Sequence, residues 1–225
     1  MESFSVLRAA AFRALKPHLF EKIFPLELAV AVKDRYGFIK SPDSAQLNQA
    51  ASDFQIGKFR RGDALITIEQ FVALPVGNKA TSLGAATRAS SDESEAFLED
   101  LIAWAAKEFT LDTKEVLPRA YFSQVEFVFA KSLGRHFADL QEIGKAITNF
   151  IQGYGLEKCP VFEFGGFTMN YDVVKYEDLK PTPQPFAIER RIGSTHDENK
   201  YFSQAPLRTQ DHRAILERIE RLLLD

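Results

Sequence analysis

Hydrophobic and polar positions follow two different periods along this chain of 225 residues. Ala64, Ile66 and Ile68 alternate with more polar neighbours, which is typical of a strand with one buried face. The segment 76–78 can turn the chain, and residues 81–89 can return as a partner strand. The sequence therefore predicts antiparallel pairing in this region.

A helical period follows at once. Residues 90–93, Ser-Ser-Asp-Glu, offer a capping box, in which a serine oxygen accepts from the N3 amide and a glutamate reaches back. The next residues repeat apolar side chains at helical spacing, on one stripe. Two more helices are predicted, over about 137–152 and after Thr209. The apolar stripe of the helix that follows residues 90–93 is Phe97, Leu101, Ala105 and Phe109.

Residues 3–24 also repeat apolar side chains every three or four positions, which predicts a helix. Pro17 removes an amide inside this pattern and should kink or divide that helix. The segment is more apolar than a helix with one wet side needs, so we expect it to dock a second subunit. The predicted interface residues are Phe4, Leu7, Phe12, Phe20 and Phe24.

The remaining apolar runs read as strands. The clearest, 121–130, has apolar residues on both sides, which favours a central position in a sheet. Gly165-Gly166 interrupts another candidate at 160–171 and suggests a bulge or a close backbone approach. The other expected strands are 28–33 and 36–40, as short strands or a hairpin, then 53–60, 186–192 and 201–205.

This order of elements predicts an α+β fold, with a largely antiparallel or mixed sheet and amphipathic helices packed on it. We detect no internal repeat in the sequence. A subdomain boundary could fall near 111–119. One continuous domain over 1–225 is favoured, because no disordered linker separates the two parts.

Composition narrows the class of protein further. The net charge is −3 and the pI is about 5.9, so the basic excess of a free nucleic-acid binder is missing. The single cysteine, Cys159, cannot form an intrachain disulfide, which fits a cytoplasmic location. No secretory signal and no membrane-spanning run is recognisable. The 20 phenylalanines indicate a large core, with some rings available for a pocket or an interface.

The first candidate for chemistry is the charged segment 189–199 between two expected strands, since loops on a rigid sheet often carry sites. The candidate catalytic residues are His196, Asp197, Glu198, Arg190 and Arg191. No metal-ligand spacing accompanies them, and two adjacent arginines on a strand point to opposite faces. A solvated hairpin tip is therefore the favoured interpretation.

A second candidate is the basic stretch Lys58, Arg60 and Arg61 around one aromatic ring, which could contact single-stranded nucleic acid. Charges that protect an edge strand from aggregation explain it equally well. The sequence contains no P-loop, dinucleotide-binding or nucleophile-elbow motif, and no cofactor or metal site is predicted.

The preferred function is a non-enzymatic interaction or assembly subunit of an intracellular multiprotein complex, with other subunits or a second copy as partner. An enzyme or small-ligand binder at 189–199 is the alternative. Weak nucleic-acid binding through residues 58–61 is the second alternative.

Overall fold

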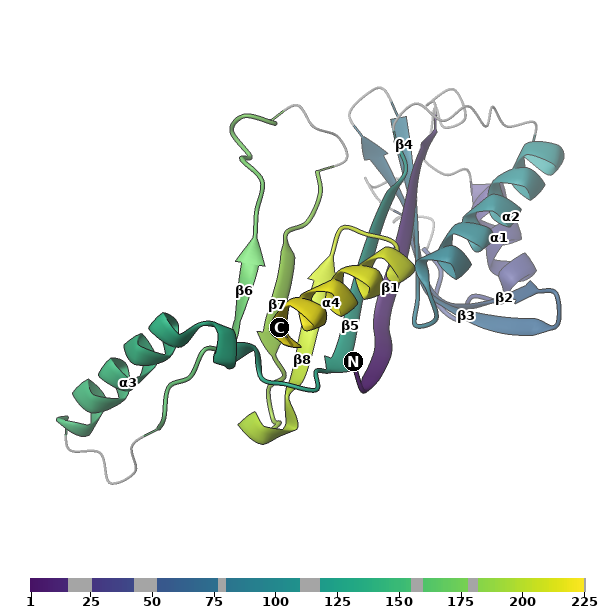
Figure 1. The fold of residues 1–225 in the computed structure, drawn as a ribbon. Helices are drawn as coiled ribbons and strands as arrows, with labels where there is room; N and C mark the ends of the chain where they lie inside the picture. Colours follow the sequence, from purple (N-terminus) through teal and green to yellow (C-terminus); the bar gives the residue numbers. More distant parts are fainter. Residues whose placement is uncertain are drawn as a thin grey trace.

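The computed structural model of the chain describes residues 1–15, 26–42, 52–76, 80–109, 118–154, 160–177 and 182–224. Eight strands form one antiparallel sheet in the order β2-β3-β4-β1-β5-β8-β7-β6 (Figure 1). The strands are β1 (Ser3–Leu15), β2 (Ser52–Arg61), β3 (Ala64–Val76), β4 (Ala80–Thr87), β5 (Ala120–Val128), β6 (Gly166–Met169), β7 (Phe186–Arg190) and β8 (Lys200–Ala205).

Four α-helices accompany the sheet in the described residues. They are α1 (Leu26–Tyr36), α2 (Ser91–Phe109), α3 (Ala138–Gln152) and α4 (Thr209–Leu224). Tyr121 and Ser123 point to the same side of β5, and they contact Glu95 of α2 and His212 of α4. Both helices therefore cover one face of the sheet. Helix α3 instead stands away from the sheet (Figure 1).

The second half of the chain repeats the topology of the first. From the centre outward, the sheet runs β1-β4-β3-β2 on one side and β5-β8-β7-β6 on the other. In each half a helix follows the first strand and another follows the last, so β1 and β5 are equivalent, as are α1 and α3, and α2 and α4. The antiparallel β1–β5 pair lies at the pseudo-two-fold axis. The sequence shows no repeat, because topology is retained by pairing and burial rather than by residue identity.

Each half has its own apolar core on the helix-covered face. The larger core belongs to the first half and gathers Phe54, Phe71 and Phe97 with residues of α1 and α2. The smaller lies between α4 and the second half, around Phe127 and Tyr201. The alternation of buried and partly buried residues along β5 follows from its pleat. The α+β class and the central place of β5 are thus confirmed.

The helix predicted over residues 3–24 is wrong for its described part, because residues 3–15 form β1. Two features hide the strand in the sequence. Arg13 lies on the buried side, where its charge breaks the apolar alternation, and a bulge between Val6 and Arg8 shifts the alternation by one residue. Residues 16–25, with Phe20 and Phe24, lie outside the described residues.

The strands predicted over 28–33 and 36–40 are also wrong, because α1 occupies residues 26–36 and residues 37–40 contribute only an isolated bridge from Lys40 to Gln55. Leu28, Val32 and Tyr36 recur at helical spacing and are all buried. A short apolar run fits the period of a strand and that of a helix, and here the helix forms because it buries this stripe. The strands expected at 53–60, 81–89, 186–192 and 201–205, and the helices after residues 90, 137 and 209, are confirmed within a few residues. The strand expected from Ala64 continues to Val76, and of the strand expected over 160–171 only residues 166–169 form β6.

Candidate functional sites

The segment 189–199 does not gather its charged side chains at one point. Arg190 lies over the ring of Tyr201, 5.1 Å from its centroid, whereas the Arg191 Nε lies 2.8 Å from Glu126 Oε2. Glu198 accepts hydrogen bonds from the amide and hydroxyl of Thr195, which lower the pKa of its carboxyl. Asp197 is exposed, and the side chain of His196 lies outside the described atoms. Arg190, Arg191 and Glu198 thus each have a local partner of their own.

The basic stretch at 58–61 belongs to β2, which is an edge strand of the sheet. Lys58 and Arg60 are exposed, and Phe59 between them is buried in the larger core, that of the first half. Arg61 forms an ion pair with Glu93 at 3.1 Å. The aromatic ring of this stretch is therefore not available to stack on a base.

The apolar side chains expected to form an N-terminal interface are distributed over both faces of β1. Phe4 packs against the smaller core, that of the second half, and the Arg213 guanidinium lies 5.4 Å from the Phe4 ring centroid. Leu7 and Phe12 line two separate cavities on the face opposite α2 and α4. Within residues 3–15 there is consequently no apolar helix face for a partner.

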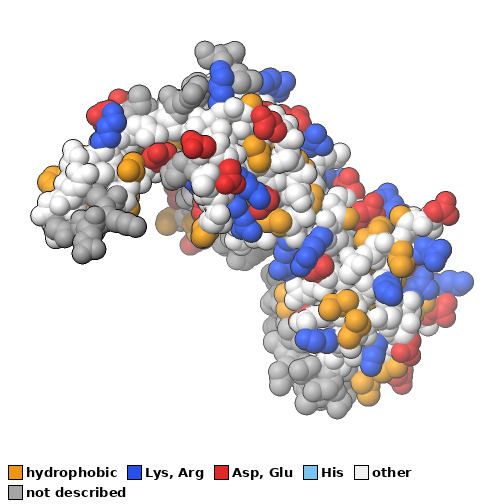
Figure 2. Space-filling view, turned by 90° about the horizontal axis from the view of Figure 1, so that it is seen from below, with side chains coloured by type: hydrophobic (Ala, Val, Ile, Leu, Met, Phe, Trp, Pro, Cys, Tyr) orange, Lys and Arg blue, Asp and Glu red, His pale blue; other side chains and the backbone are white. Residues whose placement is uncertain are grey.

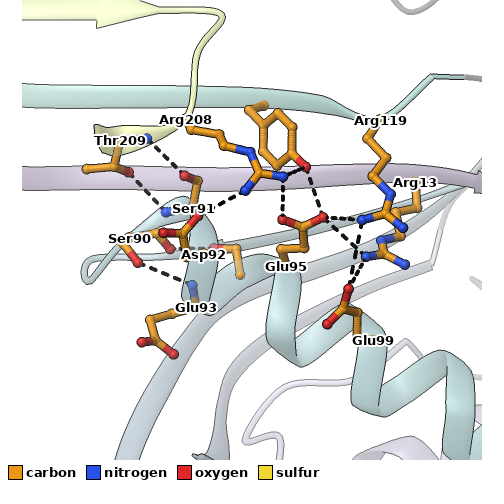
Figure 3. Close-up of polar contacts among 12 residues, drawn as sticks. Arg13, Ser90, Ser91, Asp92, Glu93, Glu95, Glu99, Arg119, Arg208 and Thr209 are labelled. Atoms are coloured by element: carbon orange, nitrogen blue, oxygen red, sulfur yellow. Dashed lines mark hydrogen bonds and ion pairs between the residues drawn. The ribbon is translucent and has the colours of Figure 1, made fainter. Parts of the chain in front are cut away.

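Glu95 of α2 is the centre of a charged network that joins the two halves (Figure 3). Its carboxylate is only 8% exposed. It accepts from Arg119 at 2.7 Å, from the Tyr121 hydroxyl at 2.9 Å and from Arg13 at 3.2 Å, and it pairs with Arg208 at 3.0 Å. The Arg208 guanidinium also lies 4.4 Å from the Tyr121 ring centroid.

This network holds the Glu95 carboxyl in its charged form. Burial would raise the pKa of the Glu95 carboxyl, but the hydrogen bonds from Tyr121 and Arg119 and the charges of Arg208 and Arg13 lower it. Burial and the bond to Glu95 raise the pKa of the Tyr121 hydroxyl. Because both Glu95 oxygens are engaged by residues of β1, β5 and the segments before β5 and α4, the network fixes α2 to both halves of the sheet.

The N-termini of α2 and α4 cap one another across the pseudo-two-fold axis (Figure 3). The amide of Ser91 donates to the Thr209 hydroxyl at 3.0 Å, and the amide of Thr209 donates to the Ser91 hydroxyl at 2.9 Å. The predicted capping serine is present too, since the Ser90 hydroxyl accepts from the Glu93 amide. The Glu93 carboxylate, however, pairs with Arg61.

His212 belongs to α4 and is buried, and both of its ring nitrogens have hydrogen-bond partners. Its Nδ1 is 2.8 Å from the Ser123 hydroxyl, and its Nε2 is 2.8 Å from the Ser203 hydroxyl. Burial lowers the pKa of the imidazole to about 4, so the ring is neutral at pH 7. This histidine is a satisfied core residue.

The face of the sheet opposite α2 and α4 is not covered by any described helix, and it carries two cavities. One, of about 540 Å³, is lined mainly by apolar residues, including Phe12, Phe122, Pro183 and Pro206. The other, of about 410 Å³, is polar. It is lined by Leu7, Arg8, Gln55, Glu69, Gln70, Arg88 and Gln124.

Helix α3 forms the arm at one end of the molecule (Figure 2), and it carries a stripe of exposed apolar side chains. Ile143 is 55% exposed and Phe150 is 69% exposed, with Leu140 and Ile147 on the same stripe. The other side of α3 packs on the chain itself, where the Thr148 hydroxyl accepts from the Phe162 amide at 3.0 Å. The equivalent helix α1 buries its stripe of Leu28, Val32 and Tyr36, and its exposed large apolar side chains are limited to Leu26 and Val30.

Sequence reasoning placed no site on the open face or on α3. The helical period of residues 137–152 reveals the apolar stripe of α3. The period does not reveal whether another element covers that stripe. The polar cavity combines residues from β1, β2, β3 and β5 and from just beyond β4, and no sequence spacing joins them.

Comparison with known proteins gives no relative: no protein-family model matches the chain, and neither the curated proteins nor the solved structures contain a match. Within the described residues, no group of three or more His, Cys, Asp or Glu side chains could hold a metal ion. No helix in the same residues is both long and apolar enough to cross a membrane.

Proposed function

We propose that this chain is a non-enzymatic assembly subunit that joins a multiprotein complex through α3. The observation that carries the proposal is the exposed apolar stripe of α3, compared with the buried stripe of its equivalent α1. Surface apolar residues in isolation are ordinary, but a stripe on one helix is typical of a contact surface.

The chemistry of the stripe suits a second helix. Leu140, Ile143, Ile147 and Phe150 recur with the spacing by which one helix packs into the groove of another. The simplest partner is a second copy of the chain, because a two-fold axis can pair the same stripe with itself. An α-helix of 15 residues is about 22 Å long.

The segment that packs on α3 extends this surface. Val161 is 70% exposed and Phe162 is 40% exposed, and the Phe162 amide donates to Thr148 of α3. A stable interface buries about 1,200–2,000 Å² in total, so α3 needs such neighbours to reach that size.

Sedimentation velocity of the purified chain at micromolar concentration tests the proposal. We expect a dimer, and we expect the double variant Ile143→Asp, Phe150→Asp to be a folded monomer. Ile192→Asp is the matched control, because Ile192 is 96% exposed and lies far from α3 in the sequence.

If the purified wild type is a monomer, the proposal is tested by affinity purification from cells. A tagged chain at its native level should then co-purify with a stoichiometric companion that the double variant loses and Ile192→Asp retains. A monomer with no companion, or a companion that the double variant retains, would contradict the proposal.

A further inference from the structure

A band of glutamines crosses the open face of the sheet. Gln55 of β2 lies directly opposite Gln70 of β3, and Gln124 of β5 lies directly opposite Gln204 of β8. Arg8 of β1 joins the two pairs, because it lies opposite Gln124 and donates to Gln70 Oε1 at 2.7 Å. Five strand spacings of about 4.8 Å give the band a length of about 24 Å.

The backbone under one end of this band is irregular in three strands. β1 is bulged between Val6 and Arg8, and β3 is bulged between Ile68 and Gln70. In β2, Ile56 has a φ of 57°. A left-handed conformation is unfavourable for a β-branched residue. Bulges re-aim side chains and are common beside binding sites.

These irregularities surround the polar cavity of about 410 Å³. Both bulged residues, Leu7 and Glu69, line the cavity together with Gln55, Gln70 and Gln124. Three of the four glutamines of the band therefore meet in one hollow, and the strained backbone is what turns their neighbours toward it.

Hydrogen bonds pre-arrange the amides of the cavity. Asp53 accepts from Gln55 Nε2 at 2.9 Å and from Gln70 Nε2 at 3.0 Å, which fixes both amides and leaves Gln55 Oε1 directed away from that carboxylate. The Gln124 side chain makes no hydrogen bond to a described residue. A ligand would thus meet oriented donors and acceptors.

The charges around the cavity cancel. Arg8 and Arg88 are balanced by Asp53 and Glu69, and Arg88 Nε lies 3.3 Å from Glu69 Oε1. A polyanion needs a surplus of positive charge. Uncharged hydroxyl groups need what is present here, since an amide, a carboxylate or a guanidinium can each accept from or donate to a hydroxyl.

An apolar surface adjoins this polar one. Phe122 lies two residues before Gln124 on the same side of β5, and with Phe12 it lines the apolar cavity of about 540 Å³. A sugar ring has hydroxyl groups at its rim and C–H groups on its faces. It can therefore hydrogen-bond to amides while resting on an aromatic ring.

We propose that the open face binds a neutral glycan chain, with sugar hydroxyls held by Gln55, Gln70, Gln124 and Arg8 and with Gln204 extending the site. The site is independent of the α3 surface and goes beyond the assembly function. Its ligand class follows from a balanced charge, an amide band of chain length and an adjoining aromatic surface.

The first test is an array of neutral oligosaccharides of hexoses and N-acetylhexosamines, followed by calorimetric titration of the best binder. We expect binding to at least one oligosaccharide. Gln70→Ala and Gln124→Ala should each weaken it about tenfold, the effect of losing one or two hydrogen bonds. Gln152→Ala is the matched control, because Gln152 is an exposed glutamine of α3.

Gln204→Ala provides a second variant if either of the first two fails to fold, as judged by thermal melting. The α3 double variant should bind the oligosaccharide as the wild type does, which separates this inference from the assembly function. No binding to any array member, or binding that Gln70→Ala, Gln124→Ala and Gln204→Ala all leave unchanged, overturns the proposal. Binding only to heparin or oligo(dT), with steep salt dependence, would also overturn it and would indicate a polyanion site.

Discussion

The two halves of this molecule share one topology but use their first helix in different ways. In the first half, α1 packs on α2, where Tyr36 donates to Asp100 at 2.6 Å and its ring lies 4.9 Å from that of Phe97. In the second half, α3 leaves α4 uncovered and projects from the sheet (Figure 1). The difference teaches that one half builds the larger core, whereas the other keeps an apolar helix for an outside contact.

The largest effect should come from the core of the first half. Phe97 is fully buried, so Phe97→Ala should lower the free energy of unfolding by about 3–5 kcal/mol. Phe150→Ala, on the exposed stripe of α3, should change it by less than about 0.5 kcal/mol. Urea unfolding of both variants at low protein concentration checks the contrast. Equal losses would mean that α3 is part of a core after all.

The junction between the halves should be nearly as sensitive. Glu95→Gln removes the charge that Arg13, Arg119 and Arg208 share, and we expect a loss of about 3 kcal/mol in unfolding free energy. Glu217→Gln is the control, because its pair with Arg213 is largely exposed and worth less than about 1 kcal/mol. Similar urea midpoints for the two variants would refute the structural role of Glu95.

Lowering the pH should reduce the free energy of unfolding through a histidine of the second half. Ser94 and His212 each lie three residues after the first residue of their helix, but only the histidine titrates. Its pKa is about 4 when folded and 6.5 when unfolded, so the unfolded state binds the proton first. Its contribution is fully present above about pH 6.5 and is lost as the pH falls to about 4, a total of about 3 kcal/mol.

The measurement is urea unfolding between pH 7 and pH 4 of the wild type and His212→Gln. The variant should be less stable at pH 7 but should lack this component of the pH dependence. If the two proteins lose stability in parallel over that range, His212 is not the titrating group.

The smallest effect should come from the reciprocal caps. Ser91→Ala or Thr209→Ala removes one hydroxyl that caps the opposite helix, at a cost of about 1 kcal/mol each. Because the two hydrogen bonds share one junction, the double variant should cost less or more than the sum of the single variants. A double-mutant cycle by thermal unfolding measures this coupling, and strict additivity would show that the two caps act independently.

The sequence could predict the elements that obey one period and bury one side. Strand β5 and helix α2 do so, and their positions were expected. Strand β1 does not, because the buried Arg13 pairs with Glu95 and Glu99, which lie 82 and 86 residues away in the chain. Helix α1 is short, and its run of apolar residues fits a strand equally well.

The candidate sites depend on distances that local patterns do not contain. Gln55 and Gln204 occupy ordinary polar positions of their strands, and only the register of five intervening pairings places them in one band. The segment 189–199 was a candidate because its charges are adjacent in sequence. Folding separates them, with Arg190 on Tyr201 and Arg191 on Glu126.

The contrast between α1 and α3 can be measured directly by hydrogen–deuterium exchange of the wild type at several protein concentrations, with the companion added if one is found. The amides of α1 should be protected equally at all concentrations. The amides of α3 should be weakly protected in the dilute monomer and should gain protection as the partner binds. Protection of α3 that equals that of α1 in the dilute monomer, or that never increases with concentration or companion, would contradict the account.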